Sequence, residues 1–506
     1  MSVTATNPIL PGFYPDPSIC AVGDDFYLVN SSFAYFPGIP IMHSKDLAHW
    51  EQIGNACDRE SQLPLGDTGH SRGLFAPTIR YHEGTFYIIC TNVSYGGNFI
   101  ITAQNPTGPW SEPHYIEGAD GIDPSLFFDE DGTCYYIGTH PNPEGCQYDG
   151  DWYIWIQELD IENMKLVGEV HNVWNGAMRN IIWPEGPHLY KIGEYYYIMH
   201  AEGGTGPDHA VTVCRSKNVY GPYENNFCNP ILTHRHLGRK YPICYVGHAD
   251  LVKTINDEWY MVMLAVRPLE GYTTMGRETF LARVEWENDW PVVNPGVGRL
   301  TDTVEINLPK WTTYTAESNE YVFSTMGQLP PEFMVLRNAD KSHYSLEKGK
   351  GLLMLFDTHT LKEQASPSYL ALRQKHHHFI AKALLDVSNL SEDKRAGIAY
   401  VQNNLYNLRV EVDGKMAEVI LCEKGTDRRV ISMPLQGSNP LEVSLEVDGL
   451  SAAVIIEGQK SPEVDIRTLS TEVAGGFTGC TVGLYAVADT ENTDCACFKR
   501  FSYSEG

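Results

Sequence analysis

Short apolar runs alternate with clusters of Gly, Asp, Asn and Pro along the whole chain. The runs are rich in Tyr, Phe, Trp, Val and Ile, which are the residues enriched in β-strands. Amphipathic helix patterns, with apolar residues at every third or fourth position, are scarce. The pattern therefore predicts a protein that is nearly all β.

One unit recurs within the first three hundred residues. It consists of an acidic or glycine turn, an aromatic pair in an apolar strand, a loop, and a second strand that ends near an aromatic residue. Its copies are spaced by roughly fifty to sixty residues, as propeller blades with loop insertions would be. Generic hairpins of a large sandwich also place aromatic pairs after turns, but five regular copies favour a five-bladed β-propeller. The copies begin at residues 23–27, 83–87, 131–136, 193–197 and 256–260.

The repeat is no longer recognisable after residues 294–298, and a different residue pattern begins near Trp311. Beyond Met334, alternating strands such as 407–412 and 441–447 recur without the aromatic pair, which is typical of a β-sandwich. We therefore predict a five-bladed propeller domain over residues 1–310, followed by a jelly-roll-like β-sandwich domain over residues 311–506.

The composition of the chain limits the classes of binding partner and indicates a cellular location. The chain of 506 residues has 37 Lys and Arg against 64 Asp and Glu, a formal charge of −27, which disfavours nucleic acid and anionic membranes as partners. The first thirty residues lack the pattern of a signal peptide, and cysteines such as Cys90 and Cys214 sit inside apolar runs. We expect a cytoplasmic protein. The sequence leaves open whether it forms a homo-oligomer.

Three acids precede the strand pairs of different repeats. Asp16 lies between two prolines in 13–18, Asp123 lies in the similar segment 121–125, and Glu185 lies in 183–188. An ordinary turn explains any single Asp-Pro-Ser, but equivalent placement in several blades favours convergence on the central channel of a propeller. Carboxylates held across a gap suit glycosidic bond hydrolysis by an acid and a base or nucleophile.

Two other segments invite a metal interpretation. The spacing in Cys495-Ala496-Cys497 is not that of the familiar zinc and redox motifs, and consecutive strand residues such as His376, His377 and His378 point to opposite faces. We predict ordinary strand residues at both places.

The three acidic segments together resemble those of glycoside hydrolase family 43. The resemblance extends through residues 33–38, 43–47, 75–77 and 247–250 and covers the whole chain, because the second domain resembles the accessory domain of the family's β-xylosidases and α-L-arabinofuranosidases. It implies an inverting mechanism in which Asp16 is the general base, Glu185 the general acid, and Asp123 raises the pKa of Glu185 and holds it in position.

The resemblance also implies a subsite for the terminal sugar. Phe33 and Phe75 would wall it, with Ala76 next in the same motif, and Arg267 would hydrogen-bond the sugar hydroxyls from the fifth blade. Phe75 departs from many relatives, which carry Trp before this Ala-Pro, so the sugar preference is less well defined.

Two further residues are candidates for the pocket. Thr205 follows two glycines and either faces the pocket or belongs to an ordinary turn. In some relatives the histidine equivalent to His248 helps to hold a calcium ion with waters in the central channel. His248 is therefore either a calcium ligand or a channel histidine that hydrogen-bonds carboxylates or substrate.

These features predict an exo-acting β-xylosidase, with α-L-arabinofuranosidase activity, that acts on xylo-oligosaccharides or arabinoxylan fragments. A dedicated α-L-arabinofuranosidase is the alternative within the same class. From a different class, a carbohydrate-binding propeller and sandwich could use the same acids only to hydrogen-bond sugar hydroxyls.

Overall fold

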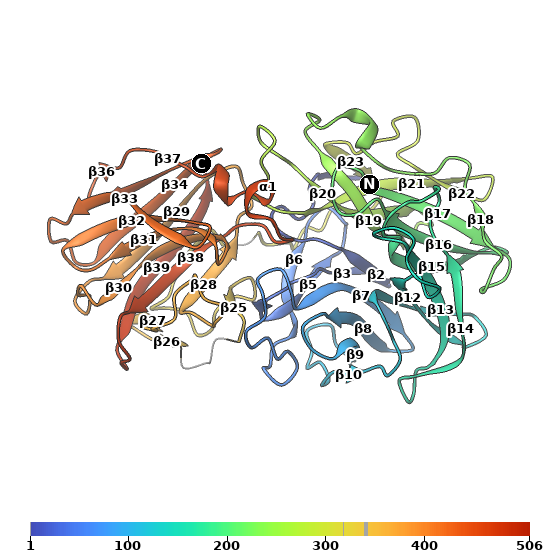
Figure 1. Ribbon diagram of the computed structural model, residues 1–506, viewed down its shortest axis with the longest axis horizontal. Coiled ribbons are helices and arrows are strands. Elements are labelled where there is room, and N and C mark those ends of the chain that lie inside the picture. The colour runs from blue at the N-terminus through green and yellow to red at the C-terminus, as the bar shows by residue number, and fades with distance from the viewer. Residues whose placement is uncertain (1, 317, 339–342) are drawn as a thin grey trace.

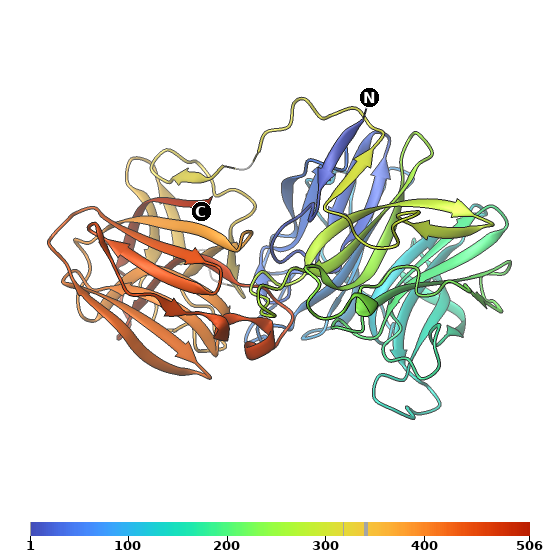
Figure 2. The same cartoon turned by 90° about the horizontal axis from the view of Figure 1, so that it is seen from above.

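The computed structural model describes residues 2–316, 318–338 and 343–506 and shows two all-β parts side by side (Figures 1 and 2). The N-terminal part is a five-bladed propeller, and the C-terminal part is a sandwich of two sheets. The predicted all-β fold of propeller and sandwich is confirmed.

Each blade is a four-stranded antiparallel sheet built from one continuous segment, and residues 18–293, all of them described, form five such blades. Blades 1 and 2 consist of β2 (Ser18–Val22), β3 (Asp25–Val29), β5 (Gly38–Ser44), β6 (Glu51–Cys57), and β7 (Leu74–His82), β8 (Thr85–Asn92), β9 (Gly97–Ala103), β10 (His114–Tyr115). Blades 3 and 4 consist of β11 (Ile122–Phe128), β12 (Cys134–Pro141), β13 (Trp152–Asp160), β14 (Lys165–Trp174), and β15 (Glu185–Ile192), β16 (Tyr195–Glu202), β17 (Ala210–Ser216), β18 (Glu224–Asn225). Blade 5 consists of β19 (Cys244–Lys253), β20 (Trp259–Val266), β21 (Glu278–Glu287) and β22 (Trp290–Val293).

The first strand of each blade lies at the centre of the propeller. β2, β7, β11, β15 and β19 contact one another in turn around a closed ring. Apolar side chains fill the space between blades; Val29 of blade 1, for example, belongs to the same buried cluster as Ile79 and Ile88 of blade 2. The two ends of the propeller are joined by β1 (Val3–Thr6), which pairs with β23 (Thr303–Ile306). Closure of the ring brings residues far apart in sequence to one central channel.

The sandwich packs a nine-stranded sheet on an eight-stranded sheet, counted over the described residues. The first sheet contains β24 (Glu320–Val322), β26 (Tyr344–Glu347), β27 (Gly351–Leu355), β29 (His378–Asp386), β34 (Leu441–Asp448), β35 (Ser451–Ile456), β36 (Gln459–Lys460), β37 (Val464–Asp465) and β39 (Cys495–Glu505). The second contains β4 (Tyr35–Phe36), β25 (Met334–Leu336), β28 (Tyr369–Arg373), β30 (Lys394–Asn403), β31 (Tyr406–Val412), β32 (Met416–Glu423), β33 (Thr426–Pro434) and β38 (Thr481–Ala488). The helical segments described are η1 (Arg235–Leu237), η3 (Arg467–Leu469) and α1 (Thr471–Ala474).

The two domains share a sheet edge. β4 comes from the propeller segment but pairs with β25, with Phe36 opposite Val335 and Tyr35 opposite Leu336. The boundary expected near residue 310 falls in the connection between β23 and β24. The sandwich is therefore anchored directly beside Phe33, at the mouth of the propeller channel.

Of the two segments with a metal interpretation, Cys495-Ala496-Cys497 lies in a strand as predicted, whereas His376 and His377 precede the strand that His378 begins. Cys495 and Cys497 lie on β39, and β29 begins at His378. Across the described ranges, no group of three or more His, Cys, Asp or Glu side chains is placed to hold a metal ion. Among the same residues, no helix has the length and apolar character needed to span a bilayer.

Candidate active site

Each blade places a left-handed residue at an equivalent position, on its innermost strand or just before it. Each of them stands two residues before a buried polar residue of the strand, and the strand pairing shifts beside them in blades 2 to 5. A backbone with φ near +50° breaks the alternation of the strand and redirects the side chain. The residues are Asp16 (φ 52°), Ala76 (φ 24°), Asp123 (φ 53°), Gly186 (φ 56°) and His248 (φ 48°).

This repeat corrects the placement of one acid. Asp16 and Asp123 occupy equivalent positions, as the sequence predicted, but the equivalent residue of blade 4 is Gly186. Glu185 pairs with Ala201 just before the shift in register, as Ile122 pairs with Thr139 in blade 3. Glu185 therefore enters the site from the position one residue earlier. The prediction missed this offset because the sequence motif does not show where the bulge begins.

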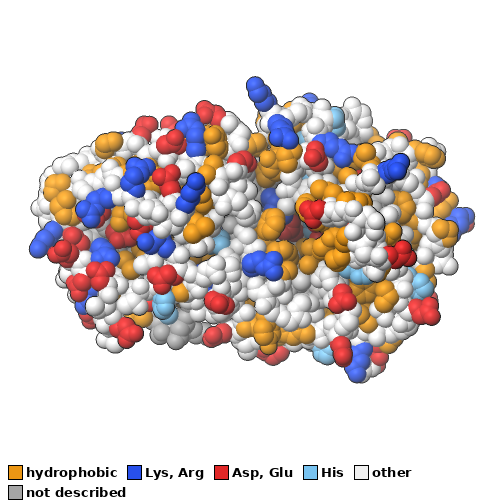
Figure 3. Space-filling model, in the orientation of Figure 1, with side chains coloured by type: hydrophobic (Ala, Val, Ile, Leu, Met, Phe, Trp, Pro, Cys, Tyr) orange, Lys and Arg blue, Asp and Glu red, His pale blue; other side chains and the backbone are white. Residues whose placement is uncertain are grey.

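A cavity of about 430 Å³ opens at this end of the channel. Hydrophobic side chains gather on the propeller half close to the junction with the sandwich in the view of Figure 3. The residues predicted from sequence that line the cavity are Asp16, Phe33, Phe75, Ala76, Asp123, Glu185, Thr205 and His248. Its other lining residues are Ile122, Trp152, Trp183, Gly203, Gly204, Gly206, Arg277 and Phe477.

Arg267 does not line the cavity, and the arginine that does is Arg277. Arg267 donates from Nε and Nη2 to the two carboxylate oxygens of Glu278, both at 2.8 Å. Ala265 and Glu278 are opposite each other on β20 and β21, so this bidentate pair follows from the register of the strands. Because successive strand residues alternate in direction, Arg277, one residue before Glu278, faces the pocket instead.

Asp16 is held as a carboxylate. Its Oδ1 accepts a hydrogen bond from Nη1 of Arg277 at 2.7 Å, and its Oδ2 accepts one from Oγ of Ser31 at 2.6 Å. Burial by itself raises the pKa of Asp16, but the charges of Arg277 and His248 and the Ser31 hydrogen bond together lower it below the usual value. Asp16 is therefore ionised at neutral pH and able to accept a proton.

Asp123 and Glu185 show the opposite behaviour. Burial raises the pKa of Asp123 to about 6, and its Oδ2 accepts a hydrogen bond from the backbone N–H of Gly186 at 3.0 Å. Burial, followed by the negative charges of Asp123 and Asp16, raises the pKa of Glu185 well above its usual value. The pKa values of Glu185 and Asp16 are therefore displaced in opposite directions, which favours a protonated Glu185 beside an ionised Asp16, an arrangement suited to paired acid and base catalysis.

Three phenylalanines form one wall of the pocket. The ring centroids of Phe33 and Phe75 lie 5.3 Å apart, and Phe477 stacks on Phe33 at 6.2 Å. Phe477 belongs to the connection between α1 and β38 of the sandwich, and the guanidinium of Arg277 lies 5.6 Å from its ring. The sandwich thus completes the pocket, which the sequence did not predict.

Other lining residues were missed for different reasons. Trp183 stands in the segment that carries Glu185, so its proximity could have been inferred. Trp152 begins β13, and no motif marks it. Arg277 and Phe477 carry no local signal, because their place depends on strand direction and on the docking of the second domain. Thr205 contacts Nη1 of Arg277 through its Oγ1 at 3.4 Å.

The side chains around His248 are a poor donor set for a calcium ion. Nδ1 of His248 lies 3.8 Å from Oδ1 of Asp16, which already accepts from Arg277, and Oδ2 of Asp123 accepts from a backbone N–H. Calcium takes about six to eight oxygen ligands. One imidazole and carboxylate oxygens that are partly engaged supply few of these ligands, so the side chains by themselves do not form a calcium site. The catalytic steps below are therefore assigned to side chains alone.

The fold and the site together are those of a glycoside hydrolase. A closed propeller holds a carboxyl group with a lowered pKa and one with a raised pKa in a single pocket with an aromatic wall. Residues 5–291 match the model of glycosyl hydrolases family 43, and residues 321–504 match the β-xylosidase C-terminal concanavalin A-like domain. The chain belongs to glycoside hydrolase family 43.

Its similarity to individual family members extends over the full length. It is 51% identical to a xylosidase/arabinosidase of Butyrivibrio fibrisolvens, over 99% of this chain and 100% of that protein. It is 38% identical to a non-reducing end α-L-arabinofuranosidase of Bacteroides ovatus, over 99% and 94% of the two chains. The crystal structure of a xylan β-1,4-xylosidase from Bacillus halodurans superposes with a TM-score of 0.91 at 33% identity, covering 99% of this chain and 100% of that one.

Proposed function

We propose that the protein is an exo-acting, inverting glycosidase that releases terminal xylose and arabinofuranose from xylo-oligosaccharides or arabinoxylan fragments. The observation that carries the proposal is the opposite displacement of two pKa values in one pocket, lowered for Asp16 and raised for Glu185. The names of the relatives, a xylosidase/arabinosidase and an arabinofuranosidase, support the two sugars.

Each carboxyl group has a distinct part in the reaction. Asp16 takes a proton from a water molecule, whose oxygen attacks the anomeric carbon on the face opposite the leaving group. Glu185 gives its proton to the glycosidic oxygen as the bond breaks. Asp123 keeps Glu185 protonated through its negative charge, which favours the neutral form of that neighbour.

The pocket supports removal of a single terminal sugar. Phe33, Phe75 and Phe477 present apolar surface on which a sugar ring face packs. Arg277 and Thr205 supply hydrogen-bond donors on another side. Xylopyranose and arabinofuranose present similar hydroxyls to such a pocket, so we infer that both are accepted.

The acid and the base are tested separately with nitrophenyl and disaccharide substrates. Glu185→Gln should reduce kcat on xylobiose by about 10²- to 10⁴-fold, and much less on nitrophenyl xyloside, whose leaving group needs little protonation. Asp16→Asn should reduce kcat on both by a similar factor, because activation of water is needed in either case. Asp120→Asn, an exposed acid three residues before Asp123, is the control and should leave kcat unchanged.

Comparison of nitrophenyl xyloside with nitrophenyl arabinofuranoside measures the sugar preference, and comparable rates are expected. Proton NMR of the first-formed anomer should show inversion. Undiminished hydrolysis by Asp16→Asn and Glu185→Gln would refute the assignment of roles, and binding of xylobiose by the wild type without cleavage would favour a carbohydrate-binding protein. The cytoplasmic location and the state of oligomerisation stay predictions.

A further inference from the structure

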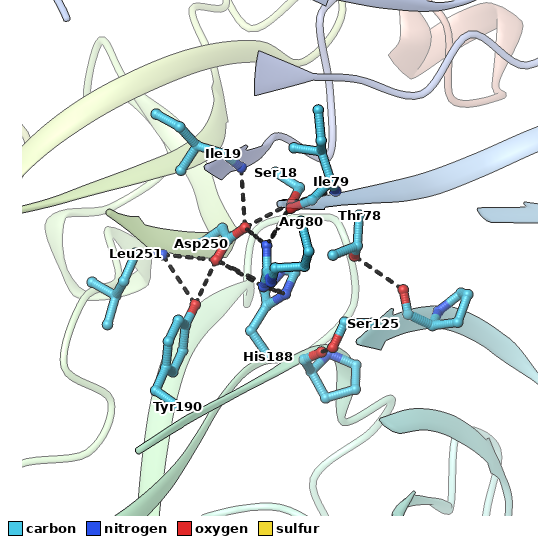
Figure 4. Close-up of polar contacts among 12 residues, drawn as sticks. Ser18, Ile19, Thr78, Ile79, Arg80, Ser125, His188, Tyr190, Asp250 and Leu251 are labelled. Atoms are coloured by element: carbon cyan, nitrogen blue, oxygen red, sulfur yellow. Dashed lines mark hydrogen bonds and ion pairs between the residues drawn. The ribbon is translucent and has the colours of Figure 1, made fainter. Parts of the chain in front are cut away.

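A second layer of polar side chains lies beneath the catalytic acids. In each blade it is formed by the residue two positions after the left-handed residue, so the layer repeats the five-fold order of the innermost strands. These residues are Ser18, Thr78, Ser125, His188 and Asp250, which converge in Figure 4. All are buried, with at most 4% of their surface exposed.

Hydrogen bonds in this layer connect neighbouring blades. Oγ1 of Thr78 donates to the carbonyl of Pro124 at 3.0 Å, and Oγ of Ser125 donates to the carbonyl of Pro187 at 2.7 Å. Oγ of Ser18 donates to Oδ2 of Asp250 at 2.7 Å, which joins blade 1 to blade 5. The layer therefore contains one buried carboxylate whose charge must be balanced.

Arg80 balances that charge from blade 2. Its Nη1 donates to Oδ2 of Asp250 at 2.8 Å, and its Nη2 lies 2.8 Å from Nδ1 of His188. Nη2 also reaches Oδ1 of Asp250 at 3.3 Å, so the guanidinium spans both carboxylate oxygens. One side chain thus links blades 2, 4 and 5 across the channel (Figure 4).

The carboxylate of Asp250 has no oxygen left unengaged. Besides Arg80 and Ser18, it accepts from the hydroxyl of Tyr190 at 2.6 Å, from the backbone N–H of Ile19 at 3.0 Å and from its own neighbour Leu251 at 2.9 Å. Although burial opposes ionisation, Arg80 holds the pKa of Asp250 far below its usual value.

His188 adds no charge to the layer. Burial lowers the pKa of His188 to about 3, so the ring is neutral at physiological pH. Because the guanidinium only donates, Nδ1 of His188 accepts from Arg80. The layer therefore holds one positive and one negative charge, and a divalent cation added there would be repelled by Arg80 and would find the oxygens of Asp250 engaged.

We propose that Arg80 is the built-in cation of the propeller channel, which takes the structural place of a bound metal ion between the blades. The inference goes beyond the proposed hydrolytic function, because it concerns what holds the channel together and not which sugar is cleaved.

The first test uses the wild-type protein and does not depend on activity. Protein dialysed without chelator is measured for calcium by atomic emission, and its Tm is recorded with added Ca²⁺ and with EDTA. The expected results are no stoichiometric calcium and an unchanged Tm in both conditions. Bound calcium, or a Tm that EDTA lowers, would overturn the proposal.

The second test removes the cation. Arg80→Met leaves the charge of Asp250 unpaired in a buried site, so Tm should fall by roughly 5 to 10 °C. Ca²⁺ should now raise the Tm of this variant, because the carboxylate, Ser18, Tyr190 and His188 surround the vacated position. In the double variant Arg80→Met/Asp250→Asn the response to Ca²⁺ should disappear.

Arg283→Met is the matched control, since Arg283 forms ion pairs with Glu258 and Glu285 on the exposed side of blade 5. Its Tm should change by about 2 °C or less and should not respond to Ca²⁺. If Ca²⁺ leaves Arg80→Met unchanged, Arg80 is a packing residue and the proposal fails. If Arg80→Met does not fold, bound calcium in the wild type or a Tm that EDTA lowers would still refute the proposal.

Discussion

The pair formed by Asp16 and Arg277 makes a quantitative prediction about the pH profile. Both side chains are buried, 6% and 9% exposed, and the atoms Oδ1 and Nη1 are 2.7 Å apart. An opposite charge at such a distance lowers the pKa of an aspartate by about 1 to 3 units, a differential interaction of about 1.4 to 4 kcal/mol. Arg277→Met removes this charge but keeps much of the side-chain volume.

The direction of the change follows from the role of the base. Asp16 must be ionised to act, so the acidic limb of kcat/KM reports its pKa in the free enzyme. In the wild type this limb should lie below the usual aspartate value, because Arg277 lowers the pKa against the effect of burial. In Arg277→Met the effect of burial is opposed mainly by His248 and the Ser31 hydrogen bond, and the limb should move up by about 1 to 3 pH units.

The assay is kcat/KM for nitrophenyl xyloside measured across the pH range. Arg267→Met is the matched control, because Arg267 is also bonded to a buried carboxylate, that of Glu278, but lies outside the pocket. It should lower Tm without moving the limb. If Arg277→Met loses the same factor at every pH and keeps the wild-type limb, Arg277 binds substrate without controlling Asp16, and the reasoning is refuted.

Two further substitutions test the geometry of the pocket. Gly186→Ala places a methyl group about 2.8 Å from the ring of His248 and should reduce kcat more than tenfold. Gly193→Ala has a similar φ and open space around it, so it should only lower the free energy of unfolding, by about 1 kcal/mol. Equal losses of kcat in the two variants would contradict the role of this contact. Phe477→Ala removes the wall supplied by the sandwich and should raise KM for xylobiose by about tenfold, as expected for about 1.4 kcal/mol of lost packing. Val473→Ala, on α1 and outside the pocket, should leave KM unchanged, and an unaltered KM in Phe477→Ala would show that the wall does not contact the sugar.

Much of the fold could be predicted from local pattern. Each blade is one continuous segment whose turn and aromatic pair repeat, so the number of blades and the order of their strands were readable from the chain. The same repeat brought Asp16 and Asp123 to equivalent channel positions, because a closed ring leaves the first strand of each blade at the centre.

The amino-acid sequence by itself therefore determined the propeller, the sandwich and the three acids of the pocket. Only the tertiary structure decided that Glu185 stands one residue earlier in its blade than Asp123 does, that Arg277 and not Arg267 lines the pocket, and that Phe477 closes it. Those facts depend on where a bulge begins, on which face of a strand a side chain lies, and on the docking of a second domain. The first two depend on the register between paired strands and the third on contact between two domains, and a local pattern encodes neither.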